Sequence, residues 1–123
     1  MKKLAAAGSS IFLALFFGFC LGGCRSAFVS ATIANHSSQP VTLLEVDYPS
    51  ASFGFGALAP GAESHYRFKI QGSGPIKFQF TDVAGKTHTV SGPDISEGEQ
   101  GTLQIIINPA DEISWVPNLT KIR

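Results

Sequence analysis

Stretches in which apolar and polar residues alternate follow one another along most of the chain. From residue 29 onward they predict β-strands, because successive side chains of a strand point to opposite faces of a sheet. One such stretch places Leu44, Val46 and Tyr48 on one face and Leu43 on the other. The predicted strands cover residues 29–33, 41–48, 64–70, 76–81, 87–91, 102–108 and 113–115. The less regular segment 50–58 suits a short edge strand or a bulge.

Clusters of turn-forming residues separate these strands. A polar cluster fills residues 35–40, and Ala59-Pro60-Gly61-Ala62 fits a type II turn with Gly at the position that needs positive φ. Gly72-Ser73-Gly74 is predicted to join the strands before and after it as a hairpin, and residues 82–86 to close a second one. Residues 92–101 are predicted to form an acidic loop.

The pattern predicts an all-β fold. Its short strands with one apolar face favour an antiparallel, immunoglobulin-like β-sandwich of about seven strands, with a small barrel as the alternative. With 123 residues the chain is long enough for one domain, and its 13 glycines and 7 prolines agree with many turns. The Cys and Trp hallmarks of antibody domains are absent.

The first 21 residues have a different pattern. Lys2 and Lys3 precede an apolar run over residues 4–19, the order of a secretory signal peptide with a helical apolar segment. An uncleaved anchor helix is the alternative, because residues 4–21 just reach the length that crosses a bilayer.

The sequence Leu21-Gly22-Gly23-Cys24 follows this run and resembles the lipobox of bacterial lipoproteins. The resemblance implies recognition of Leu21, Gly22 and Gly23 by a dedicated signal peptidase, cleavage before Cys24, and covalent diacylglycerol and N-acyl chains on Cys24. The implied organisation is a signal peptide over 1–23, a lipidated Cys and short leash over 24–27, a β-sandwich over 28–117 and a C-terminal tail over 118–123. No other cofactor is expected.

The lipid chains would attach the protein to the cell envelope. Several acyl chains on one residue anchor stably, whereas one chain holds only marginally. Arg25 stands where an Asp would mark inner-membrane retention in the family, so the periplasmic face of the outer membrane is favoured for a Gram-negative source. The leash would span roughly 10 Å, which keeps the domain close to the bilayer.

Charge and isolated histidines exclude several functions. Nine basic residues balance nine acidic ones, so no basic surface indicates nucleic acid as a partner. His36, His65 and His88 are far apart in sequence and lack metal-ligand spacing, although His65 and His88 would meet if their strands were neighbours. The chain also lacks a Gly-x-Ser-x-Gly motif. We therefore expect no metal site and no catalytic residues.

Aromatic residues are the remaining candidates for binding. Tyr48, Phe53, Phe55 and Trp115 could contact a partner or ligand, or they could plug one end of the sandwich. The mature region resembles uncharacterised bacterial β-sandwich domains in general layout, which implies no activity. The sequence thus predicts a non-enzymatic interaction or structural module for another envelope protein. The alternative is a β-sandwich that binds sugars or lipids through an aromatic patch.

Overall fold

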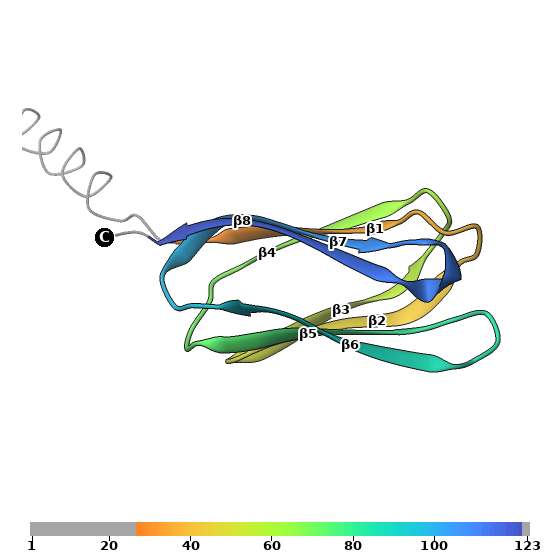
Figure 1. Ribbon diagram of the computed structural model, residues 1–123, viewed down its shortest axis with the longest axis horizontal. Coiled ribbons are helices and arrows are strands. Elements are labelled where there is room, and N and C mark those ends of the chain that lie inside the picture. The colour runs from red at the N-terminus through yellow and green to blue at the C-terminus, as the bar shows by residue number, and fades with distance from the viewer. Residues whose placement is uncertain (1–26, 122–123) are drawn as a thin grey trace, which may run out of the picture.

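Eight strands and one short 3₁₀ helix make up the computed structural model, which describes residues 27–121 (Figure 1). The predicted signal peptide over residues 1–23 and the predicted lipidation site Cys24 lie outside the described residues. The elements are β1 (Val29–Asn35), β2 (Val41–Tyr48), β3 (Ala51–Leu58), β4 (Glu63–Phe68), β5 (Gly74–Thr81), β6 (Thr87–Ile95), β7 (Glu99–Ile107), η1 (Pro109–Asp111) and β8 (Ile113–Lys121).

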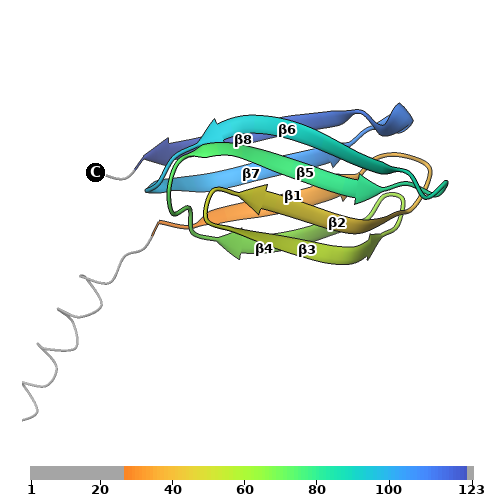
Figure 2. The same cartoon turned by 90° about the horizontal axis from the view of Figure 1, so that it is seen from below.

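The strands form two four-stranded sheets stacked as a sandwich (Figures 1 and 2). Sheet A has the order β4-β1-β7-β8 and sheet B the order β3-β2-β5-β6. All pairs are antiparallel except β1 with β7, which is parallel. The all-β sandwich prediction is confirmed.

The strand count differs from the prediction, and the strand order differs from that of antibody constant domains. Eight strands are present where about seven were expected. In constant-type immunoglobulin domains the first strand pairs with the second, whereas here β1 lies between β4 and β7. Alternation reports which face a residue occupies but not which strand is its neighbour.

The predicted hairpin around Gly72-Ser73-Gly74 is wrong for the same reason. β4 belongs to sheet A and β5 to sheet B, so the segment between them crosses from one sheet to the other. Ile70 in this crossing is buried, which explains why it continued the apolar pattern of the strand before it. The second predicted hairpin, between β5 and β6, is confirmed, as is the type II turn, where Gly61 has φ +77° and Ala62 N–H donates to Ala59 O.

Two strands extend further than the sequence indicated. β6 continues to Ile95 and β7 begins at Glu99, so the predicted acidic loop shrinks to residues 96–98. β8 runs through Pro117 to Lys121, and the predicted tail from residue 118 therefore begins inside a strand. A proline is tolerated there because β8 is an edge strand, where the missing N–H leaves no ladder bond broken.

The core lies between the inner faces of the two sheets. Leu103, Ile105 and Ile107 of β7 are fully buried, and β7 lies inside sheet A between β1 and β8. On the inner face of sheet B, the buried rings of Phe78 and Phe80 of β5 stack on each other at a centroid distance of 5.4 Å.

One polar residue, Asn35, is fully buried among the described residues. Its amide nitrogen donates to Leu58 O and Gln39 O, and its oxygen accepts from Ser37 N–H and Oγ–H. All its polar atoms are thus paired, which removes the cost of burying them.

The two ends of the sandwich differ. β1 begins, and β8 ends, at the same end, since Val29 pairs with Gly101 and Lys121 with Glu99. The opposite end, here called the distal end, carries the β1–β2, β3–β4 and β5–β6 connections together with η1 (Figure 1). Residues 27–121 contain no helix of the length and apolarity needed to cross a bilayer.

Candidate functional site

Five aromatic rings close one lateral side of the sandwich, where the edge strands β3 and β4 face each other. We call this set the aromatic seam: Tyr48, Phe53, Phe55, Tyr66 and Phe68. Phe53 stacks on Tyr66 with their ring centroids 4.3 Å apart, and the ring centroids of Tyr48 and Phe68 are 4.5 Å apart. Because β3 and β4 belong to different sheets and share no ladder, ring packing holds this side together.

The seam separates the predicted aromatic residues by exposure. Phe53 is 7% exposed and belongs to the core, whereas Phe55 is half-buried at the outer part of the seam. Burial raises the pKa of the Tyr48 hydroxyl, and the nearby Tyr66 adds to the rise. Tyr48 and Phe53 therefore stabilise the fold, and Phe55 remains accessible to a partner.

Trp115 is not part of this group. It lies on β8 at the other lateral side, where it packs against Gly92 of β6. The four predicted residues therefore do not form one patch. Each lateral side of the sandwich is closed by its own aromatic residues.

Leu43 was not among the residues that the sequence pattern predicted for binding, but its conformation and exposure make it a candidate. It sits in a β-bulge between β2 and β5, has φ +51° and is 65% exposed. A positive φ is costly for a leucine, and burial does not offset that cost here. The available signal was a leucine on the polar face of its strand, beside Glu45 and Asp47.

A shallow groove of about 420 Å³ lies beside Leu43 on the outer face of sheet B. Phe55 and Gly56 of β3 form its apolar side, and Glu45 and Gln79 add polar groups. The groove therefore joins the outer part of the aromatic seam to the exposed bulge.

Strand β3 also has an unprotected edge. Natural sheets discourage added strands by placing charges or proline on edge strands. The other three edge strands follow this rule: β4 contains Glu63 and Arg67, while β6 and β8 contain Pro93 and Pro117. The sequence of β3, Ala51–Leu58, has neither charge nor proline.

The histidines do not gather as a group. His65 is on β4 of sheet A and His88 on β6 of sheet B, so the two do not meet. His65 Nδ1 lies 3.0 Å from Thr32 Oγ1, and its Nε2 lies 3.7 Å from Glu63 Oε2. The side chains of His65 and Glu63 are 68% and 54% exposed, so water screens this pair.

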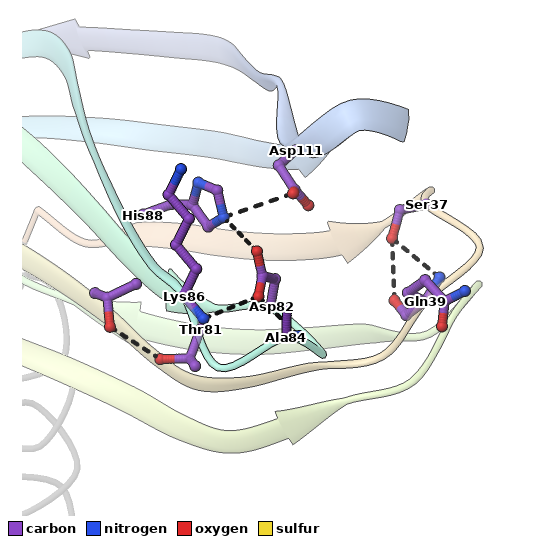
Figure 3. Close-up of polar contacts among 9 residues, drawn as sticks. Ser37, Gln39, Thr81, Asp82, Ala84, Lys86, His88 and Asp111 are labelled. Atoms are coloured by element: carbon purple, nitrogen blue, oxygen red, sulfur yellow. Dashed lines mark hydrogen bonds and ion pairs between the residues drawn. The ribbon is translucent and has the colours of Figure 1, made fainter.

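His88 instead meets two carboxylates that sequence spacing did not connect with it. Its Nε2 lies 2.7 Å from Asp82 Oδ2 and 3.5 Å from Asp111 Oδ2 (Figure 3). Asp82 Oδ1 accepts from Ala84 N–H and Lys86 N–H. The hydrogen bond with His88, followed by that from Lys86, lowers the pKa of Asp82.

Comparison with known proteins identifies a fold but no family. No protein-family model matches the chain, and no curated protein matches it in sequence. The NMR structure of a protein from Eubacterium rectale is similar, with a TM-score of 0.55, 9% identity, and coverage of 76% of this chain and 93% of that one. At this identity the similarity supports the sandwich fold alone.

Proposed function

We propose that the chain is a lipid-anchored envelope protein whose β-sandwich is a non-enzymatic interaction module, with β3 and the neighbouring groove as its docking surface. The anchoring half rests on Leu21-Gly22-Gly23-Cys24. The described domain begins with β1 at Val29, a few residues after Cys24, so the domain would stay close to the membrane. The periplasmic face of a Gram-negative outer membrane is the proposed location.

Lipidation is tested by labelling growing cells with palmitate. The wild-type chain should carry the label and Cys24→Ala should lose it, because the acyl chains attach to the Cys24 sulfur and amino group. Cys20→Ala is the matched control and should keep the label, since residue 20 lies in the proposed signal peptide. Inhibition of the lipoprotein signal peptidase should leave a heavier precursor. A wild-type protein without label contradicts the anchor.

The interaction half rests on Leu43, an exposed apolar side chain held at a costly backbone angle beside an unprotected edge strand. Such strain persists where the surrounding structure enforces it, and it is concentrated at functional sites. A partner that adds a strand to β3 would gain backbone hydrogen bonds there and place apolar side chains against Leu43 and Phe55.

The sugar- or lipid-binding alternative has less support. Rings that stack on a sugar would have to line a concave surface. Of the predicted aromatic residues, Phe55 alone lines the groove, while Phe53 is in the core and Trp115 is on the other side of the molecule.

Site-specific photocrosslinking in intact cells tests the docking surface. A photoreactive residue at position 43 should give one heavier adduct, and the same residue at Gln104, exposed on sheet A, should not.

Two variants should abolish the adduct without unfolding the domain. Ser52→Lys places a charge on the β3 edge opposite Asp47, which offers a favourable cross-strand pair.

The second variant, Phe55→Ser, replaces an apolar residue that lines the groove and keeps the edge uncharged. Because the Phe55 ring also packs against Phe53 in the aromatic seam, some loss of stability is expected. Circular dichroism verifies that each variant is folded. Equal adducts from positions 43 and 104, or adducts that survive both variants, would refute the docking surface while leaving the lipid anchor untouched.

A further inference from the structure

Three side chains with metal-binding atoms meet at the distal end of the sandwich (Figure 3). Asp82 belongs to the β5–β6 connection, His88 to β6 and Asp111 to η1. One ligand atom from each lies within 4.8 Å of the others. We propose that Asp82, His88 and Asp111 form a binding site for Zn²⁺.

The distances suit such an ion. Zinc binds imidazole nitrogen and carboxylate oxygen at about 2.0–2.2 Å, which in a tetrahedron places neighbouring ligand atoms about 3.3 Å apart. The Nε2 atom of His88 is 2.7 Å from Asp82 Oδ2 and 3.5 Å from Asp111 Oδ2. The Asp82 and Asp111 oxygens lie within 4.8 Å of each other, so side-chain shifts of about 1 Å would bring all three atoms to a single ion.

The charges also favour a cation. Two carboxylates face one ring nitrogen, which carries at most one proton and makes its short contact with Asp82. Within residues 27–121, no Lys or Arg forms an ion pair with Asp82 or Asp111. A divalent ion balances both carboxylates, which a single N–H donor does not.

The ligands are already oriented. Asp82 Oδ1 is occupied by Ala84 N–H and Lys86 N–H, so its Oδ2 is directed toward His88. The His88 ring stacks on the Phe80 ring with a centroid distance of 4.9 Å and an interplanar angle of 15°. This stacking holds Nε2 of His88 in place. Such supporting contacts are what fixes metal ligands in proteins.

The site remains accessible to water. The side chains of His88, Asp82 and Asp111 are 21%, 17% and 34% exposed. Three protein ligands with an open fourth position are typical of zinc sites that retain a water molecule or accept an external ligand. The ion would link sheet B to the β7–β8 connection of sheet A.

Isothermal titration of ZnCl₂ into the full-length protein in detergent tests the site. The parent carries Cys20→Ser and Cys24→Ser so that no thiol competes. We expect one Zn²⁺ per chain with micromolar affinity, and visible absorption of tetrahedral Co²⁺ when CoCl₂ replaces zinc. His88→Gln and Asp111→Asn should each weaken Zn²⁺ binding by at least about tenfold.

His65→Gln is the matched control, because His65 also lies beside a carboxylate but has only Glu63. It should bind Zn²⁺ like the parent. Since Asp111 is one-third exposed, Asp111→Asn should stay folded even if His88→Gln does not. A parent that binds no Zn²⁺ overturns the proposal, as does unchanged affinity in Asp111→Asn or equal loss in His65→Gln.

Discussion

Single residues decide how closely the strands of this sandwich approach. A Cβ atom at Gly54 would lie 2.5 Å from Leu44 O, whereas one at Gly56 would meet no atom within 4 Å. The two glycines are two residues apart in β3, and neither has the positive φ that itself demands glycine. Gly54 is therefore required by the position of the Leu44 carbonyl, next to the bulge at Leu43.

This difference predicts unequal effects of the same substitution. Gly54→Ala should lower the free energy of unfolding by about 1–3 kcal/mol, because the backbone of β2 must shift to relieve the clash. Gly56→Ala should leave it unchanged or raise it by up to about 1 kcal/mol, since alanine restricts the unfolded chain. Urea denaturation of both variants measures the effect, and equal losses would argue against the close approach.

At the scale of residues, sequence reasoning succeeded where a side chain's face was the question. Alternation alone placed Leu44 and Val46 on the same face of their strand, and both are buried in the core. It failed where two distant residues had to meet. Asp111 is 23 residues from His88 in sequence, and only the pairing of β7 with β8 and the stacking of the two sheets bring them together.

Among the elements, β6 and β8 show how one lateral side of the sandwich is closed without a ladder. A Cβ at Gly92 would lie 2.7 Å from three atoms of the Trp115 ring, so the indole rests directly on the glycine backbone. The indole Nε1 is buried and has no hydrogen-bond partner among the described residues. Apolar packing therefore provides the stabilisation of this contact. Burying the indole N–H without a hydrogen-bond acceptor costs free energy and reduces that stabilisation.

A double-mutant cycle tests this contact. Gly92→Ala should lower the free energy of unfolding by about 1–3 kcal/mol, because the new methyl group displaces the indole. In a Trp115→Leu background the same substitution should cost much less, since the ring is gone. Thermal or urea unfolding of the four proteins gives the coupling energy. Additive effects would show that Gly92 and Trp115 act independently.

Element boundaries and pairings were only partly predictable. The bounds of β2 agree with the pattern from 41 to 48, because turn residues end the alternation on both sides. β8 was shortened at Pro117, since a proline reads as a stop unless the strand is known to lie at an edge. The crossing between β4 and β5 contains the same glycines as a hairpin, so composition does not separate the two.

At the scale of the complete sandwich, the proposed zinc site lies at the end opposite to the start of β1. β1 has seven residues, which corresponds to roughly 23 Å, and it begins a few residues after the proposed anchor Cys24 and finishes at the distal end. With a leash of about 10 Å, the docking surface on β3 would lie within one domain length of the bilayer. A partner that meets it there would itself be near the membrane.

Lengthening the leash tests this arrangement. A 20-residue Gly/Ser insertion after Arg25 would raise the average reach by about 25 Å without altering the sandwich. Palmitate labelling should persist, while the crosslinked adduct from position 43 should decrease because the domain no longer stays at one height. An unchanged adduct yield would indicate a partner that does not depend on distance from the membrane.

The central position of β1 has a mechanical consequence. β1 is the first strand after the proposed anchor, and ladders to β4 and β7 hold it on both sides along nearly its full length. A pull on the anchor against a partner held by the body would run along β1, so both ladders would bear the load in shear and their hydrogen bonds would have to break together. Force resistance is governed by the rate of unfolding, and this arrangement would slow unfolding under a pull from the proposed anchor.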